Sequence, residues 1–210
     1  MNVVFDFGAV LFGWQPQALV ASAFPDRAAN PEQAAALAKA MFGHADWLSF
    51  DRGTLSMQAV IDQTASRLDL EHATVATLVQ NIGEQLAPIE GTLDILTRLS
   101  RRRAQGDDSL RLFYLSNMSV PFARALERNH DFLSWFEGGI FSGDVHLVKP
   151  EPEIFALLES RYALEPCNTV FIDDVAGNVA AARTRGWQGI HFESPTQLHA
   201  QLMPLLCSNG

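Results

Sequence analysis

Polar residues that could take part in catalysis follow short apolar runs at three places in this chain. These residues are Asp6 after residues 3–5, Ser116 after residues 112–115, and Asp173 with Asp174 after residues 170–172. A carboxylate such as Asp6 can serve as a nucleophile, and a hydroxyl with nearby backbone N–H groups can bind an anion. Two adjacent carboxylates repel each other unless a cation or hydrogen bonds hold them, and oxygen ligands suit Mg²⁺. The combination indicates anion chemistry beside a metal ion.

Two further polar residues complete this candidate set. Asn117 follows Ser116, and Lys149 follows a fourth, weaker apolar run at residues 139–142. Lys149 could neutralise a phosphate or a carboxylate. Taken singly, each of these residues is just as typical of a turn or a solvated loop, so the prediction depends on their combination.

The apolar runs are typical of strands that are buried on both faces of a parallel sheet. Helical patterns lie between and after them, at residues 92–99, 121–128, 152–158 and 178–185. Alternating strands and helices predict an α/β fold with a doubly wound, Rossmann-like parallel sheet. Ligands of such sheets bind outside the carboxyl ends of the strands, which is where the polar residues would lie.

Residues 14–88 differ from the rest of the chain. They contain helical patterns at 31–41 and 55–68 but no convincing buried strand. This segment leaves the α/β core just after the first strand and returns before Thr92. An inserted α-helical cap over the strand ends is therefore expected. The predicted domains are an α/β core of residues 1–13 and 89–210 and a helical cap of residues 14–88.

Composition narrows the class of protein. The 210 residues are 48% hydrophobic and 19% charged, as in a folded globular protein, and carry a formal net charge of −9. An acidic surface disfavours nucleic-acid binding, because phosphates repel it. The two cysteines, Cys167 and Cys207, exclude a disulfide framework. Without a signal peptide or an apolar run of about 18 residues, a cytoplasmic protein with no membrane partner is expected. The oligomeric state is not predictable.

Taken together, the motifs resemble those of the haloacid dehalogenase superfamily. The matching residues, in motif order, are Asp6, Ser116, Lys149, and Asp173 and Asp174 with Asn178. The resemblance covers nearly the whole chain, including residues 149–155 and the helical insertion. It is strongest toward the branch that contains α-D-glucose-1-phosphatase and the phosphatase domain of soluble epoxide hydrolase.

The resemblance implies a Mg²⁺-dependent phosphomonoester hydrolase that acts on a small phosphorylated molecule. Asp6 would attack phosphorus and form an aspartyl phosphate that water then hydrolyses. The implied metal ligands are Asp6, the Gly8 carbonyl and Asp174, with Asp173 as a further or outer ligand. The implied phosphate contacts are Ser116, the N–H of Asn117, and Lys149. Asn178 would orient the loop of the fourth motif.

Gly8 departs from the pattern of most phosphatases in this superfamily. They carry a second Asp two residues after the nucleophile, where it serves as general acid and base, and such catalysis typically contributes ~10²- to 10⁴-fold. The glycine therefore predicts a slow phosphatase, another proton donor, or a substrate with a good leaving group such as a sugar 1-phosphate or an acyl phosphate.

The cap is expected to select the substrate. Its candidate contacts are His44, Trp47 and Arg52, with Trp14 and Gln15 near the first loop. A purely structural interpretation is at least as good for each: Trp47 suits a core, and Arg52 could pair with Asp46 or Asp51.

Two other functions remain open. In 2-haloacid dehalogenases the same Asp attacks carbon without a metal, and these relatives carry Ser-Ser-Asn at the fourth motif. The pair Asp173 and Asp174 therefore favours phosphate chemistry. A catalytically impaired protein that only binds phosphate or metal is the third interpretation.

Overall fold

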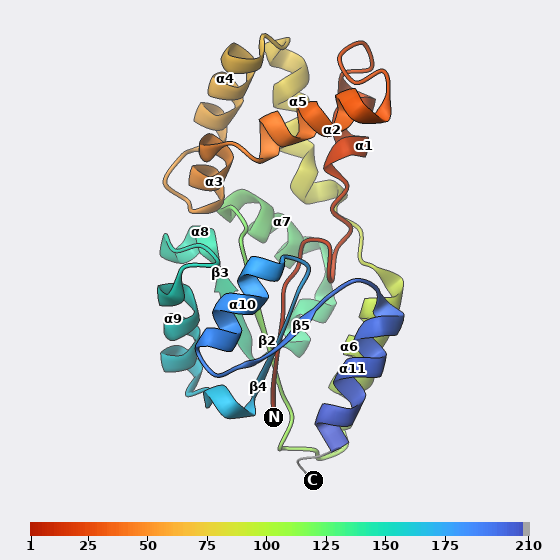
Figure 1. The fold of residues 1–210 in the computed structure, drawn as a ribbon, viewed down its shortest axis with the longest axis vertical. Helices are drawn as coiled ribbons and strands as arrows, with labels where there is room; N and C mark the ends of the chain where they lie inside the picture. The colour runs from red at the N-terminus through yellow and green to blue at the C-terminus, as the bar shows by residue number, and fades with distance from the viewer. Residues whose placement is uncertain (208–210) are drawn as a thin grey trace.

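A computed structural model describes residues 1–207 and contains a five-stranded sheet in which every pair of neighbouring strands is parallel (Figure 1). The strand order is β3-β2-β1-β4-β5. The strands are β1 (Asn2–Phe5), β2 (Arg111–Ser116), β3 (Gly138–Phe141), β4 (Thr169–Asp173) and β5 (Gln188–His191). The prediction of a doubly wound parallel sheet is confirmed. The strand order reverses at β1, so the ends of β1, β2 and β4 lie next to one another at the switch point.

The central strands form because both of their faces are buried. All residues of β1 and β4 are buried, so alternate side chains enter different cores. Val3 and Phe5 belong to one cluster and Val4 to the other. The edge strand β5 was not predicted from the sequence. Gln188 is partly exposed and His191 is exposed, so this strand contains no continuous apolar run.

Helices cover both faces of the sheet. The core helices are α6 (Glu90–Ala104), α7 (Val120–Asn129), α8 (Ser142–Val145), α9 (Pro152–Tyr162), α10 (Ala176–Thr184) and α11 (Pro195–Cys207), with 3₁₀ turns at Asp131–Trp135 and Pro166–Asn168. The cluster on the Val3 face contains Leu96 of α6 and Leu202 of α11, and the cluster on the Val4 face contains Phe155 of α9. The sheet is therefore the middle layer of three.

Five helices lie beyond the carboxyl ends of the strands, at the top of Figure 1. They are α1 (Pro16–Ala23), α2 (Pro31–Phe42), α3 (Ala45–Asp51), α4 (Met57–Leu68) and α5 (His72–Gln85), and we call them the helical unit. Side-chain caps define the starts of α2 to α5; Asn30, for example, accepts a hydrogen bond from the N–H of Gln33 at 2.9 Å, and Ser56 accepts one from the N–H of Ala59 at 3.2 Å. No helix within residues 1–207 is long and apolar enough to cross a membrane.

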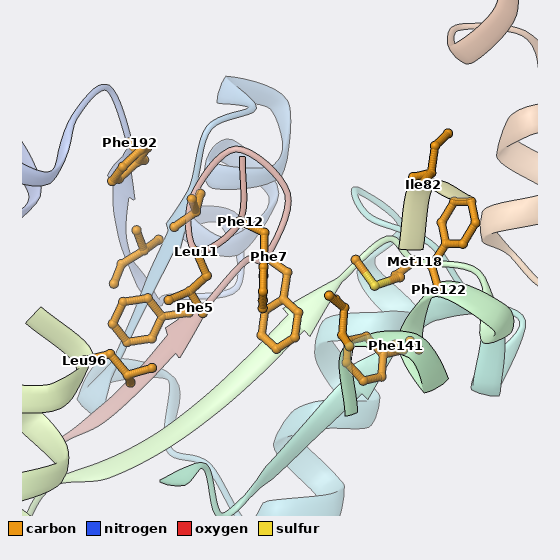
Figure 2. Close-up of a cluster of buried hydrophobic side chains, with 14 of the residues drawn as sticks. Phe5, Phe7, Leu11, Phe12, Ile82, Leu96, Met118, Phe122, Phe141 and Phe192 are labelled. Carbon is orange, nitrogen blue, oxygen red and sulfur yellow. The ribbon is translucent and has the colours of Figure 1, made fainter. Parts of the chain in front are cut away.

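The helical unit packs directly on the core. Ile82 of α5 lies beside Met118 and Phe122 in Figure 2. A Cβ added to Gly83 would come within 3.0 Å of the Phe122 Cα, so this glycine permits the close approach of α5 to α7. Phe50 of α3 packs edge-on against the same phenylalanine, with ring centroids 5.4 Å apart. These contacts fix the helical unit over the strand ends.

Candidate active site

The nucleophile candidate Asp6 lies at the carboxyl end of the central strand. Its N–H donates to the Ile172 carbonyl of β4 at 2.9 Å, which extends the parallel pairing by one residue. The chain then turns sharply: Phe7 N–H donates to Asp6 Oδ1 at 2.7 Å, and Ala9 adopts a φ of 57°. The turn leaves the buried carboxylate of Asp6 bordering the cavity at the end of the sheet while the backbone folds back beside it.

Lys149 joins two of the predicted carboxylates. Its Nζ lies 2.8 Å from Asp6 Oδ1 and 2.6 Å from Asp173 Oδ2, and its side chain is only 1% exposed. Burial disfavours the ammonium, but the two carboxylates outweigh burial and raise the pKa of Lys149. Burial and the charge of Asp173 raise the pKa of Asp6 to about 7 against the opposing effect of Lys149. The ammonium of Lys149 therefore bridges the carboxylates of Asp6 and Asp173.

Asn117 holds the lysine loop in place. Its Oδ1 accepts from the N–H of Lys149 at 2.7 Å, and its Nδ2 donates to the Lys149 carbonyl at 3.0 Å. The sequence predicted only a contact from the backbone of Asn117 and did not foresee this side-chain clamp. Ser116 is buried at the end of β2, close enough to Asp6 for its hydrogen bond to lower the pKa of that carboxyl.

Hydrogen bonds surround Asp173 on several sides. Its Oδ1 accepts from the N–H of Val175 at 2.7 Å and from Asn178 Nδ2 at 3.0 Å. Lys149 is a further donor to the same carboxylate. Of the two adjacent acidic residues, Asp174 is the one that lines the neighbouring cavity. His191, which the sequence analysis did not select, lies 2.8 Å by its Nε2 from the Asp174 carbonyl and supports this loop.

The donor set fits a divalent cation. Asp6, Asp173 and Asp174 each offer one carboxylate oxygen, and these oxygens lie within 4.8 Å of one another. Burial and the charge of Asp173 raise the pKa of Asp174, as expected for carboxylates that lie close together. Gly8, the predicted carbonyl ligand, lines the same cavity. Oxygen-only ligands of this kind suit Mg²⁺.

The acidic cluster borders a cavity of about 310 Å³ between the core and the helical unit. Its polar base is formed by Asp6, Ser116, Asn117, Lys149, Asp174 and Asn178. The helical unit and the segment leading into it supply apolar side chains, namely Trp14, Phe42, Trp47, Ile82 and Leu86. Met118, Phe122 and Val175 of the core complete the apolar walls. The floor of the cavity is therefore polar and charged, whereas its walls are mainly apolar and aromatic.

The structure separates the residues predicted as substrate contacts. Trp47 and Trp14 line the cavity, whereas His44, Arg52 and Gln15 do not. His44 caps α3 by accepting from the N–H of Asp46 at 3.2 Å. His44 and Arg52, which the sequence offered as substrate contacts, therefore lie outside the group of residues that line the cavity, and both side chains have other partners.

Arg52 forms a bridge between the helical unit and the core. Its guanidinium donates to both carboxylate oxygens of Glu151, at 2.9 and 2.5 Å. Glu151 also accepts from the N–H of Val148, so the ion pair sits beside the lysine loop. The sequence analysis placed the partner of Arg52 at Asp46 or Asp51, but the carboxylate that it meets is distant in sequence.

Asp51 is an acidic residue that lines the cavity but was not predicted from the sequence as a site residue. It ends α3 and borders the same cavity as Asp6. Burial raises the pKa of Asp51 well above its usual value, although a hydrogen bond from the backbone of Ser119 acts in the opposite direction. An isolated acid at the end of a helix carries no sequence signal for such a position.

Relatives of this chain include two fungal proteins. The chain is 26% identical over 205 residues to a drimenol cyclase of Aspergillus calidoustus, covering 95% of this chain but 35% of that protein. It is 23% identical over 189 residues to a sesquiterpene phosphatase of Aspergillus oryzae, covering 90% of this chain and 88% of that protein. The chain thus spans about a third of the first relative and most of the second.

Solved structures show the same fold. A HAD family enzyme of Bacteroides thetaiotaomicron, in complex with magnesium and inorganic phosphate, matches with a TM-score of 0.68 and 19% identity over 91% of this chain and 93% of that chain. An L-2-haloacid dehalogenase of Xanthobacter autotrophicus matches with a TM-score of 0.65 and 21% identity over 97% and 82% of the two chains.

The family model for haloacid dehalogenase-like hydrolases matches residues 2–186, which include every strand end that contributes to the polar floor of the cavity. That match covers most of the 210 residues. The chain therefore belongs to the haloacid dehalogenase-like hydrolases.

Proposed function

We propose that this hydrolase is a Mg²⁺-dependent phosphomonoesterase that acts through an aspartyl phosphate on Asp6. The observation that carries the proposal is the floor of the cavity, where Asp6, Lys149 and the acidic pair converge at the strand ends. The relative named as a sesquiterpene phosphatase and the structural neighbour that holds magnesium and inorganic phosphate support the same chemistry.

Each polar residue of the floor has a role in this proposal. A carboxylate oxygen of Asp6 attacks phosphorus, and Lys149, Ser116 and the N–H of Asn117 bind the transferring oxygens. Asp6, the Gly8 carbonyl and Asp174 would hold Mg²⁺, with Asp173 as an outer support. When bound, the ion offsets the repulsion between an anionic nucleophile and an anionic substrate.

The helical unit serves as the cap in this proposal, with residues 14–88 as the cap domain and residues 1–13 and 89–210 as the core. Its aromatic walls favour a monophosphate whose organic part is apolar. Apolar surface gains roughly 25 cal/mol per Å² on leaving water, whereas a sugar buried there would lose hydrogen bonds to water without replacement. The Aspergillus oryzae relative, which is named as a sesquiterpene phosphatase, agrees with this preference.

A sugar 1-phosphate is the second candidate, and Gly8 is the observation that favours it. Without an acid two residues after the nucleophile, a substrate with a good leaving group has an advantage. The aspartyl phosphate chemistry is the same in both cases, so the two candidates differ only in the organic group that the cavity accepts.

The experiment measures phosphate release from prenyl, aryl and alkyl monophosphates, sugar 1-phosphates and an acyl phosphate, with Mg²⁺ or with EDTA. We expect release that requires Mg²⁺, is abolished by Asp6→Asn, and has its highest kcat/KM on apolar monophosphates. A preference for sugar 1-phosphates would overturn the apolar class. Halide release from 2-haloacids in EDTA, without phosphate release, would overturn the phosphatase in favour of a dehalogenase.

A further inference from the structure

A carboxyl group of the helical unit shares the cavity with the nucleophile. Asp51 and Asp6 both line it, one from the end of α3 and the other from the end of β1. The other side chains that residues 14–88 place on this cavity are apolar, as far as the described part of the chain shows. Asp51 is therefore the one ionisable group that faces the site from the substrate side.

The end of α3 is fastened to the core, which fixes where this carboxyl lies. Ser142 Oγ donates to the Asp51 carbonyl at 2.6 Å, and His146 Nδ1 lies 3.0 Å from the Arg52 carbonyl. The ion pair between Arg52 and Glu151 adds two more hydrogen bonds, at 2.9 and 2.5 Å. Gly53 follows with a φ of 77°, and a Cβ there would lie 2.4 Å from the Gly143 carbonyl oxygen.

The surroundings of Asp51 suit a carboxyl group that carries a proton. Trp47, one turn earlier on α3, and Phe122 are apolar lining residues of the same cavity. Burial raises the pKa of Asp51 well above its usual value. A carboxyl group whose pKa is raised by burial holds its proton more strongly and can donate it to a leaving group inside the cavity.

The usual position for a proton donor is vacant in this chain. Gly8 lines the cavity two residues after Asp6, and a Cβ built on it meets nothing within 4 Å. A larger side chain would fit there, so packing does not demand the glycine. The proton needed by a poor leaving group must come from another wall of the cavity.

We propose that Asp51 is the general acid and base of this enzyme, supplied by the helical unit in place of a core aspartate. The proposal rests on the phosphatase function proposed above. As an Asp6 oxygen forms its bond to phosphorus, the bond from phosphorus to the ester oxygen breaks, and that oxygen takes the Asp51 proton to leave as an alcohol. Asp51 then accepts a proton from the water that attacks phosphorus, which releases inorganic phosphate and the free Asp6 carboxylate.

The test compares leaving groups in single-turnover reactions with enzyme in excess. Asp51→Asn keeps an acceptor for the Ser119 N–H but has no proton to give. We expect it to slow release of an alkyl alcohol by about 10²- to 10⁴-fold, and release of p-nitrophenol, which can leave as an anion, by less than about threefold. Asp46→Asn, on the same helix but paired with Arg67, is the control and leaves both rates within about twofold of wild type.

Equal slowing of both leaving groups by Asp51→Asn would overturn the proposal, because a purely structural residue would affect them alike. Gly8→Asp in the Asp51→Asn background adds an acid at the usual position, and we expect it to restore at least tenfold of the lost alkyl rate. No restoration, together with equal slowing, would assign Asp51 to packing. If wild-type protein releases no phosphate that depends on Asp6, the proposed function itself fails, and this outcome is distinct from the others.

Discussion

The two walls of the cavity are built on different principles. The core wall contains polar and charged residues at the ends of β1, β2 and β4, together with Lys149, which is 1% exposed and held between two carboxylates. Apart from Asp51, the helical wall consists of aromatic and aliphatic side chains, among which Trp47 packs edge-on to Phe42 with ring centroids 4.7 Å apart. The charged groups of the core wall must keep one arrangement to remain hydrogen-bonded to one another. An apolar wall can be repacked with other apolar side chains at little cost in stability.

The difference between the two walls suits them to two different tasks, catalysis and the choice of substrate. Strand ends in a parallel sheet are rigid because their backbone is paired on both sides, so they can hold charges within hydrogen-bond distance of a reacting group. Helices that contact the core through a few side chains can change their lining without disturbing that charge network. We therefore expect changes in the core wall to lower turnover on every substrate and changes in the apolar side chains of the helical wall to alter the choice of substrate.

Lys149→Met should have the largest effect that is common to all substrates. It removes the cation from between Asp6 and Asp173 and removes one contact to the phosphoryl oxygens, and loss of such a group typically costs about 10²- to 10³-fold in kcat. We expect the loss on aryl, prenyl and sugar phosphates alike, measured by phosphate release. Lys39→Met, at an exposed position of α2, is the control. A loss confined to one substrate class would contradict the assignment of this lysine to the common chemistry.

 Trp47→Ala removes an aromatic side chain that is 6% exposed and lines the cavity, so it should raise KM for apolar monophosphates by about tenfold and change kcat little. Leu48→Ala, the next residue on α3 and 44% exposed, is the matched control. KM values for the two variants against wild type provide the measurement. An equal fall in kcat on all substrates would show that the two walls do not divide the tasks as described.

Arg52→Ala should have a smaller effect, because it loosens the junction between the walls without removing a lining residue. An ion pair that is partly exposed contributes about 0–1 kcal/mol to stability, so the melting temperature should change by only a few degrees. We expect kcat to fall about three- to tenfold as the end of α3 loses its bond to Glu151. Arg67→Ala, whose partner Asp46 lies within the helical unit, should leave kcat near that of wild type.

Asp51→Asn should have a small effect on stability, similar in size to that of Arg52→Ala, and the sign of this effect depends on pH. Because burial raises the pKa of Asp51 in the folded protein, the folded state keeps a proton that the unfolded chain loses above its lower pKa. Wild-type protein therefore loses stability as pH rises from the unfolded pKa toward the folded one, and the amide variant lacks this loss. We expect the melting temperature of the variant relative to wild type to increase by about 2–4 °C between pH 5 and pH 8, measured by calorimetry. A decrease over that range would contradict a buried neutral carboxyl.

Much of the core wall was predictable from local patterns. Each continuous apolar run became a buried strand, and the residue that follows it, such as Asp6 or Ser116, lies at the shared edge of the sheet. This inference works because parallel strands place their carboxyl ends together. The edge strand β5 was missed because an edge requires no continuous apolar run.

The helical wall was less predictable. Trp47 lines the cavity, whereas Arg52 binds Glu151, which lies 99 positions along the chain, and His44 caps its own helix. A helical pattern reveals which side of a helix is apolar but not which other element that side meets. Asp51 became notable only when α3 was placed against the core.

The sequence by itself determined the parallel sheet, the order of the motifs and the acidic pair, because these depend on short runs whose local chemistry dictates their position. Only the tertiary structure decided which side chains of the helical unit face Asp6, since that depends on how α3 and α5 pack on α7. Side chains from distant segments share a cavity only after the entropy of closing the chain between them has been offset by that packing.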